Sequence, residues 1–406
     1  MQPLLLAAKG LMARGHQVLA ISERCNVPDA AALGVPFLSW PTAPSRADKK
    51  PESDPLKDWE AASPLAVIAG LVNGLMCGPA AAYAADTVQA IDDFQPDVVV
   101  AQELLLGAMA GAEARGKPLA LFAANVWSLP TLPGAPVFGA GLPPARDAEE
   151  ADAYARVIAL TRSMFQMGLP ALNAARAGLG LDPLADIFAQ LDVARRILLA
   201  TSRAFDFDAS PPEPFRYVGP YLGDPAWALP WSPPWPASDQ RPLALVSFSS
   251  FYQAQDDTLR RVIEALGTLD VRALVTLGPV LKREDFPAPE NVFVVASAPH
   301  SAIYPDASVV ITHAGHGTTL RPLMAGAPLL CLPMGRDQPD NAIRVTERGA
   351  GLRLPQDATP AAIAAAVRRL LDEPAFRHAA EDLGRRIAAD QAAHSAETEL
   401  EALLPS

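Results

Sequence analysis

The residues with the clearest chemical potential form a glycine-rich turn at positions 312–319, with the sequence THAGHGTT. The apolar run before it, residues 308–311, is typical of a buried parallel strand, and residues 320–325 after it are predicted to be helical. A helix start leaves backbone N–H groups unpaired and carries partial positive charge. The turn therefore favours an anion such as a phosphate.

The side chains of the turn suit the same ligand. His313 ends the predicted strand, where an imidazole can donate to a phosphate oxygen. Gly315 and Gly317 allow a ligand to approach the backbone closely. Thr318 and Thr319 add hydroxyl donors to the first turn of the helix. Together these residues predict a site for a nucleotide-diphosphate group.

Two other interpretations remain open from the residues alone. One is a nicotinamide-dinucleotide fold, because two glycines are present and Asp337 follows the next predicted strand at about the expected distance. Against it, Leu320 stands where the third glycine belongs, and His313 and His316 have no role in that fingerprint. The other is a structural turn whose histidines bind nothing.

The C-terminal half contains an ordered series of short motifs: 299–300 (PH), 313–318 (HAGHGT), 326–328 (GAP), 337–338 (DQ), 341–342 (NA) and 348–351 (RGAG). This series resembles the donor signature of the UDP-glycosyltransferase-like family of GT-B fold, whose bacterial members glycosylate antibiotics, macrolides and lipids. The N-terminal half matches more loosely, through residues 14–18 and 95–100. The resemblance implies an α/β protein with two Rossmann-like, doubly wound domains facing across a cleft.

The resemblance also implies roles for individual residues. Asp337 and Gln338 would bind the sugar hydroxyls, and the loop with Ala298 and His300 would lie near the nucleobase. Arg321 stands where plant relatives carry a glutamate for the ribose, so a dTDP-linked donor suits this chain at least as well as a UDP-linked one. The full donor-binding set implied is Ser249, Ser250, Ala298, His300, His313, Gly315, His316, Gly317, Thr318, Asp337 and Gln338.

Such a site needs neither a metal nor a resident cofactor. The departing diphosphate gains negative charge, which a helix start and His313 would stabilise. The three cysteines lie far apart, without the spacing of metal ligands.

The catalytic base is less well defined. Residues 1–3 fall where the family has the end of its first βα loop, so the first strand and the usual histidine base are expected to be missing, and we expect the natural polypeptide to start further upstream. Gln102 stands where relatives carry the aspartate that orients the base. Glu103 is the remaining candidate, and its alternative is a solvated carboxylate at a helix start.

Length and composition indicate two domains joined by a linker over residues 206–240. The resemblance implies that residues 1–205 bind the acceptor and that residues 241–406 bind the nucleotide sugar, with terminal helices that cross back to the first domain. Nine prolines and three tryptophans between positions 211 and 236 mark the linker, whose aromatics should pack against both domains.

The net charge of −12 argues against nucleic-acid binding. Cys25, Cys77 and Cys331 indicate thiols in a reducing cytoplasm.

Residues 61–85 carry no charge and are long enough to cross a bilayer. Several glycines and prolines interrupt them, so we predict a buried helix lining an apolar acceptor cleft, without stable membrane insertion.

The sequence therefore predicts a metal-independent, inverting hexosyltransferase that uses a nucleotide-diphosphate sugar and a small, apolar, hydroxylated acceptor. Two alternatives stay open: a non-catalytic paralogue that binds nucleotide sugar or a partner, and a nucleotide-sugar epimerase on the same fold.

Overall fold

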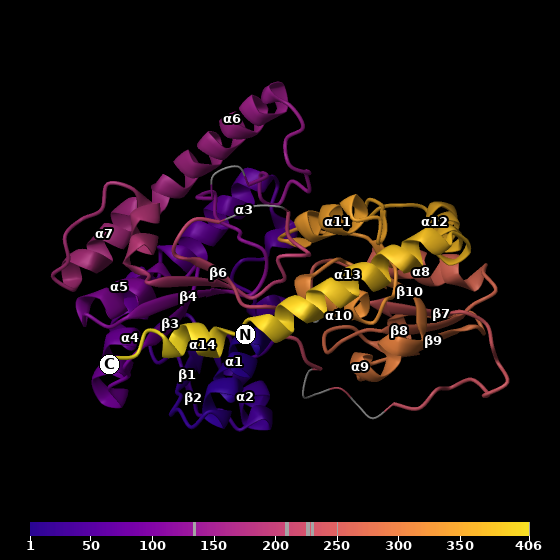
Figure 1. The fold of residues 1–406 in the computed structure, drawn as a ribbon, viewed down its shortest axis with the longest axis horizontal. Helices are drawn as coiled ribbons and strands as arrows, with labels where there is room; N and C mark the ends of the chain where they lie inside the picture. The colour runs from indigo at the N-terminus through magenta and orange to yellow at the C-terminus, as the bar shows by residue number, and fades with distance from the viewer. Residues whose placement is uncertain (133–134, 208–210, 225–227, 229–230, 250, 406) are drawn as a thin grey trace.

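The computed structural model describes residues 1–132, 135–207, 211–224, 228, 231–249 and 251–405. Figure 1 shows two α/β domains side by side, the first coloured indigo to magenta and the second orange to yellow, with α13 (Pro374–Ala393) running between them. The two-domain α/β architecture predicted from the sequence is therefore present.

The second domain is built on a parallel sheet in the order β12-β11-β10-β7-β8-β9. Its strands are β7 (Leu243–Ser247), β8 (Arg272–Thr276), β9 (Val292–Val295), β10 (Ala307–Thr312), β11 (Leu329–Cys331) and β12 (Gly351–Arg353). The strand order reverses between β7 and β10. In an open α/β sheet a ligand crevice forms at such a switch point, outside the carboxyl ends of the strands.

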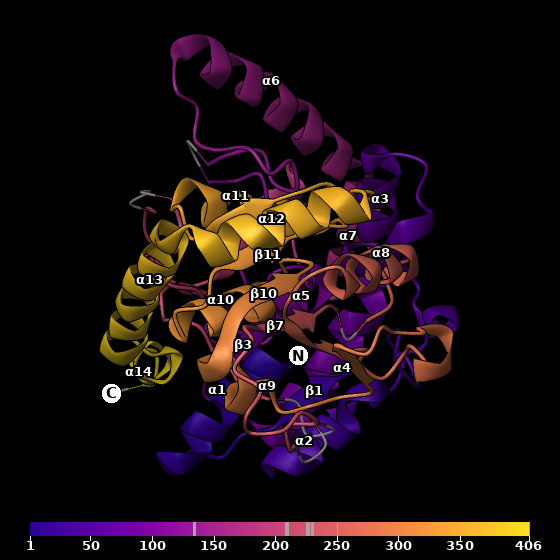
Figure 2. The same cartoon turned by 90° about the vertical axis from the view of Figure 1, so that its right-hand side faces the viewer.

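Helices cover both faces of this sheet, and Figure 2 shows β7 and β10 between α10 and α13 on one side and α8 on the other. One face packs through side chains such as Val262 and Val367, the other through Leu320 and Leu383. The helices are α8 (Asp256–Gly267), α9 (His300–Ile303), α10 (His316–Met324), α11 (Gln338–Glu347) and α12 (Pro360–Asp372).

The first domain contains two separate parallel sheets where one continuous sheet is usual for a doubly wound domain. In the described residues β1 (Ala20–Ser22) pairs with β2 (Phe37–Ser39) alone. The other sheet has the order β3-β4-β5-β6, from Val99–Gln102, Leu119–Ala123, Arg196–Leu199 and Phe215–Tyr217. Among the described residues, β1 and β3 therefore each have one edge unpaired.

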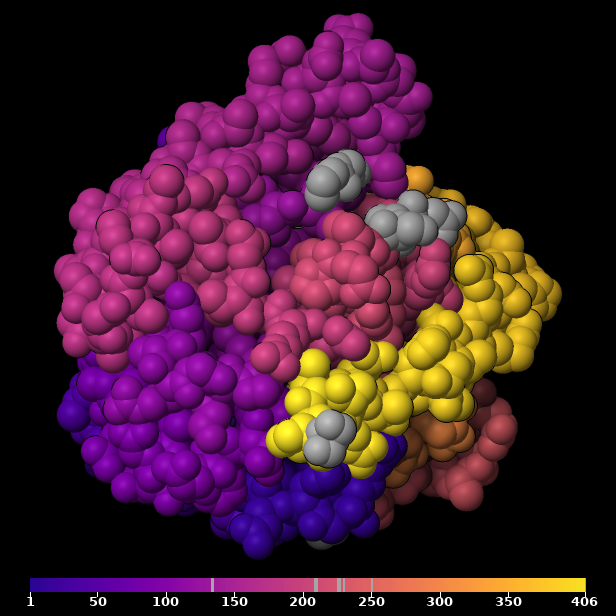
Figure 3. All heavy atoms as spheres, turned by 60° about the vertical axis from the view of Figure 1, so that its left-hand side comes forward, coloured from indigo at the N-terminus to yellow at the C-terminus, as the bar shows by residue number. Residues whose placement is uncertain are grey.

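Helices surround these sheets. Figure 3 shows α6 standing out from the surface of the first domain. The short 3₁₀ helix Gln166–Gly168 separates α6 from α7. The helices are α1 (Gln2–Ala13), α2 (Val27–Leu33), α3 (Pro64–Leu71), α4 (Ala80–Phe94), α5 (Leu106–Ala114), α6 (Ala148–Phe165) and α7 (Leu169–Gly178).

The uncharged segment folds as α3, a π-helical turn over Val72–Met76, and α4. The prediction of a buried helix is wrong for α3, none of whose residues is buried, and right for one side of α4. By length and composition the helical run Pro64–Phe94 could cross a membrane. Within the protein, 22% of its most apolar stretch is buried.

The linker differs from its prediction in one respect and agrees with it in another. β6 lies inside the range expected to be linker, yet it extends the sheet of the first domain beside β5. Trp231 and Trp235 pack together at 6.0 Å, and Trp235 contacts Phe293 of β9 at 5.7 Å. These two tryptophans hold the linker to the second domain, and Tyr221 of the linker contacts Phe122 of β4 in the first domain at 5.8 Å. Aromatic side chains of the linker therefore pack against both domains, as predicted; Trp227 lies outside the described residues.

The C-terminal segment returns to the first domain. The short helix α14 (Ala396–Glu401) packs on α1, where Leu400 joins the cluster around Ala7. A Cβ on Gly10 would lie 1.9 Å from Glu397 Oε1, so the glycine leaves room for this carboxylate against α1. The C-terminal segment is therefore attached to the first domain by the packing of α14 on α1.

Candidate functional site

The candidate site lies at the switch point of the second sheet. β7 ends at Ser247 and β10 ends at Thr312, and these neighbouring strands pair in register at those residues. The residues that follow, Phe248 and His313, bring their rings together edge to face at 6.3 Å. The predicted strand, turn and helix are thus arranged at the edge of the sheet where a ligand would bind.

His313 is a buried imidazole with a free nitrogen. The residue is 5% exposed, and its Nδ1 has no hydrogen-bond partner among the described residues. Burial lowers the pKa of His313 to about 4, so the ring is neutral near pH 7. A neutral imidazole in this position has one N–H to donate.

The start of α10 offers backbone donors. Gly315 is the N-cap residue, and no side chain caps the helix, so its first N–H groups have no intrahelical partner. The hydroxyls of Thr318 and Thr319 both donate to Gly315 O at 3.0 Å. The threonines predicted to add ligand donors are therefore engaged inside the helix, and the backbone supplies the donors instead.

The two glycines of the turn serve different purposes. A Cβ on Gly315 would lie 2.4 Å from His313 Nε2, whereas a Cβ on Gly317 would meet nothing within 4 Å. Gly315 makes room for the imidazole, and Gly317 faces open space. His316 points elsewhere: it is 8% exposed and packs against Phe205 at 6.0 Å.

Asp337 and Gln338 begin α11, close to the turn. Asn341 Nδ2 joins the two segments, because it donates to Ala314 O at 2.9 Å and to Asp337 Oδ2 at 2.8 Å. Gln338 is 1% exposed; its Oε1 accepts from Met334 N at 2.8 Å, and its Nε2 also has a protein acceptor. Asp337 is half-buried and is the polar group of the pair that remains accessible.

The serines predicted after β7 are only partly described. Ser249 is 8% exposed and accepts a hydrogen bond from Phe251 N at 3.1 Å, so its hydroxyl proton remains to be donated. Ser250 lies outside the described residues. Ala298 is 4% exposed and belongs to the core cluster under α10, where it offers no surface for base stacking.

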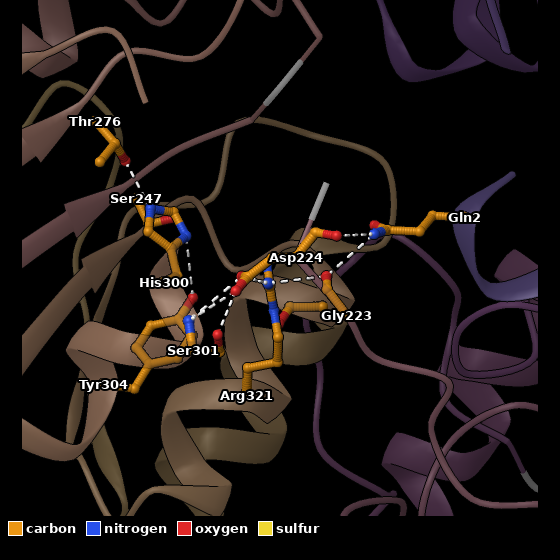
Figure 4. Close-up of polar contacts among 10 residues, drawn as sticks. Gln2, Gly223, Asp224, Ser247, Thr276, His300, Ser301, Tyr304 and Arg321 are labelled. Atoms are coloured by element: carbon orange, nitrogen blue, oxygen red, sulfur yellow. Dashed lines mark hydrogen bonds and ion pairs between the residues drawn. The ribbon is translucent and has the colours of Figure 1, made fainter. Parts of the chain in front are cut away.

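His300 connects α9 to the central strands (Figure 4). Its Nε2 lies 2.9 Å from Thr276 Oγ1 and its Nδ1 lies 3.3 Å from Ser247 Oγ. Burial, aided by the charge of Arg321, lowers the pKa of His300 to about 4. This neutral ring therefore fixes the loop that was predicted to hold the nucleobase.

Arg321 meets a carboxylate from the linker beside that loop. Its Nη1 donates to Asp224 Oδ1 at 3.0 Å and to Gly223 O at 3.1 Å. Ser301 donates its backbone N–H to the same carboxylate at 3.3 Å. From the first domain, Gln2 Nε2 donates to Gly223 O and Asp224 O, as Figure 4 shows. The charge of Arg321 is thus balanced within the protein.

Glu103 follows β3 in the first domain and is buried. It is 3% exposed, and its Oε2 has no hydrogen-bond partner among the described residues. Burial raises the pKa of Glu103 to about 7. The alternative of a solvated carboxylate is therefore wrong. Its neighbour Gln102 accepts a hydrogen bond from Leu104 N at 3.1 Å, which fixes the start of the loop.

A groove of about 380 Å³ lies where the domains meet. It is lined by Pro51, Glu52, Lys57, Trp59 and Glu60 of the first domain and by Tyr252 of the second. Trp59 and Tyr252 contact each other edge to face at 5.4 Å. Among the described residues, no group of three or more His, Cys, Asp or Glu side chains is placed to hold a metal ion.

The sequence interpretation missed the contacts that cross from the site to the first domain. Arg336 binds Asp58, and Asp340 binds the backbone of Gly139 and Gly141. Arg336 and Asp340 flank the predicted Asp337–Gln338 pair. Their position next to that pair was the one feature of the sequence that could have marked them as part of the site. Their partners are 278 and about 200 positions away, so the sequence did not indicate them.

Known proteins match both the sequence and the fold. Residues 260–403 match the family described as erythromycin biosynthesis protein CIII-like, C-terminal domain. The 4'-demethylrebeccamycin synthase of Lentzea aerocolonigenes is 30% identical over 334 residues, which cover 77% of this chain and 76% of that protein. The 10-deoxymethynolide desosaminyltransferase of Streptomyces venezuelae is 33% identical over 143 residues, covering 35% of this chain and 34% of that protein.

Solved structures agree in fold along the whole chain. The glycotransferase of kitacinnamycin superposes with a TM-score of 0.76 at 22% identity, covering 100% of this chain and 95% of that one. The glycosyltransferase VinC, solved in complex with dTDP, gives a TM-score of 0.66 at 20% identity over 99% of this chain and 96% of that one.

Proposed function

Because the chain belongs to the antibiotic-type glycosyltransferases of GT-B fold, we propose that it transfers a hexose from a nucleotide-diphosphate sugar, UDP- or dTDP-linked, to a hydroxyl of a small apolar acceptor, with inversion. One observation carries the donor half of the proposal: the uncapped start of α10 lies beside the neutral ring of His313, whose Nδ1 has no hydrogen-bond partner among the described residues.

That arrangement suits the leaving group. When the bond between the anomeric carbon and the phosphate oxygen breaks, the electron pair leaves with the diphosphate, which gains negative charge. Backbone N–H groups at the start of α10 and one N–H of His313 would stabilise this charge without reorganising. Asp337, accessible at the start of α11, would accept hydrogen bonds from the sugar hydroxyls.

Glu103 is our candidate for the general base. In a single displacement the acceptor oxygen attacks the anomeric carbon from the side opposite the diphosphate, which inverts the configuration. The acceptor proton then needs a base, and a carboxylate whose pKa burial raises to about 7 is better matched to a hydroxyl than an ordinary glutamate. Its place after β3, at the carboxyl end of the first domain's sheet, supports this role.

The acceptor and the compartment remain proposals. An apolar acceptor is supported by the aromatic pair Trp59 and Tyr252 at the groove between the domains, although carboxylates line the same groove. A cytoplasmic location is supported by Cys25, Cys77 and Cys331, which are all buried free thiols.

Calorimetric titration of UDP, dTDP and GDP into the wild-type protein and into His313→Ala tests the donor site. We expect one nucleotide to bind and the variant to lose that binding, whereas His394→Ala, at an exposed position in the same domain, should bind as wild type does. Absence of binding to the folded wild-type protein would overturn the proposal. Donor binding without transfer to any acceptor would favour the non-catalytic paralogue, and conversion of the free nucleotide sugar would favour the epimerase.

A further inference from the structure

The segment that carries Asp337 and Gln338 is attached to the first domain on both sides. Before it, Arg336 Nε and Nη2 donate to Asp58 Oδ2 and Oδ1 at 2.6 and 2.7 Å. After it, Asp340 accepts hydrogen bonds from the first domain. The residues predicted to hold the sugar therefore lie between two contacts that cross the domain boundary.

The Asp340 contact is an unusual use of a buried carboxylate. Asp340 is 4% exposed. Its Oδ2 accepts from Gly139 N at 2.6 Å and its Oδ1 from Gly141 N at 3.0 Å. Burying a carboxylate is costly unless it is fully hydrogen-bonded, and here two backbone N–H groups of the other domain supply the bonds. The loop around Gly139 is thus the main partner of this charge.

The loop is shaped for this contact. Gly139 and Gly141 have φ values of 77° and 60°, in the left-handed region. A Cβ on Gly141 would lie 2.5 Å from Arg353 Nη1 and 2.9 Å from Pro339 O. Arg353 Nη1 also donates to Gly141 O at 2.9 Å. Only glycine at position 141 lets the loop reach the start of α11.

We propose that Asp340 is a positioning residue that fixes the start of α11, and with it Asp337, to the acceptor domain through the loop of Gly139 and Gly141, with the pair Arg336 and Asp58 as a second attachment. The inference rests on the proposed function, because it takes Asp337 as the sugar-binding residue. The donor sugar is then correctly positioned relative to the acceptor only while the two domains are joined at these contacts.

This attachment has a measurable consequence for the reaction. A closed cleft excludes water and directs the sugar to the acceptor, whereas a loosened cleft lets water compete for the anomeric carbon. Loss of the Asp340 contact should therefore raise the ratio of donor hydrolysis to transfer and raise the KM for the donor sugar. It should change the affinity for the nucleotide alone much less, because the nucleotide binds at α10.

The test uses Asp340→Ala and, from the opposite domain, Gly141→Ala. Amide hydrogen exchange should show loss of protection of roughly tenfold or more at residues 139–141 in Asp340→Ala. Both variants should raise the ratio of hydrolysis to transfer, and the double variant should be no worse than either alone, because each removes the same contact. Asp257→Ala, which removes an exposed ion pair with Arg260 on α8, is the matched control.

The outcomes separate the two proposals. If the wild-type protein transfers sugar and both variants keep its ratio of hydrolysis to transfer, the positioning role is overturned and the proposed function stands. Unchanged protection of residues 139–141 in Asp340→Ala would overturn it as well. If the wild-type protein transfers no sugar, the proposed function fails, and the positioning role falls with it.

Discussion

The imidazole of His313 occupies the space that a side chain on Gly315 would fill, since a Cβ there would lie 2.4 Å from Nε2. The glycine and the histidine are two residues apart, and the left-handed Ala314 between them, with φ of 67°, turns the chain back. Asn341 holds that turn through Ala314 O at 2.9 Å. In the proposed donor site, the position of the His313 ring therefore depends on glycine at position 315.

Gly315→Ala is expected to weaken nucleotide binding by roughly tenfold or more, because the added methyl group displaces the buried ring of His313. Calorimetric titration with the nucleotide that binds the wild-type protein provides the measurement. A thermal melt checks that the variant remains folded. Nucleotide affinity equal to that of the wild type would contradict the role given to this close contact.

Gly317→Ala tests whether glycine at this position is needed for ligand binding and not for packing of the protein. A Cβ at this position meets no protein atom within 4 Å, and alanine is favoured over glycine within a helix. The free energy of unfolding should therefore stay equal or rise by about 0.5 to 1 kcal/mol. Donor affinity should nevertheless fall, because the methyl group occupies the space in front of the helix start. Unchanged donor affinity would place the diphosphate elsewhere.

Glu103 should control the pH dependence of transfer. As a base it acts only when ionised, so kcat/KM should rise with pH, with an apparent pKa near the value of about 7 to which burial raises the Glu103 carboxyl. Glu103→Gln should lower the rate of sugar transfer by roughly a hundredfold or more, and its kcat/KM should no longer rise with pH around that pKa. A profile that is unchanged in the variant would exclude Glu103 as the base.

The same substitution should stabilise the protein at alkaline pH. The folded pKa of about 7 lies above the ordinary glutamate value of 4.5, so the folded state holds the proton more tightly. Stability contributed by protonated Glu103 is fully present below pH 4.5 and is lost as the pH rises to 7. At about pH 8, Glu103→Gln should raise the free energy of unfolding by on the order of 1 to 3 kcal/mol, measured by urea unfolding.

A buried ion pair joins the linker to α11. Arg344 Nε and Nη2 donate to Asp206 Oδ1 at 2.9 and 2.7 Å, and the two side chains are only 9% and 11% exposed. Arg344→Met leaves Asp206 buried without its cation and should lower the free energy of unfolding by roughly 3 kcal/mol. Arg260→Met, which breaks an exposed pair, should cost about 1 kcal/mol or less. Equal losses in the two variants would contradict this assignment.

The sequence by itself determined the strand, turn and helix of the proposed donor site. The spacing of apolar residues and glycines fixes this unit locally, so β10, the turn at His313 and α10 were predicted correctly. The resemblance carried by the same residues gave the family and the two-domain fold.

Only the tertiary structure decided which side chains of that unit remain accessible. It turns the hydroxyl of Thr318 into the helix, buries Gln338 and leaves Asp337 accessible. It also buries Glu103, divides the first sheet and joins Arg336 to Asp58. Backbone geometry depends on neighbours in the chain, which the sequence shows directly. Desolvation and contacts between domains depend on residues hundreds of positions apart, which only the folded chain brings together.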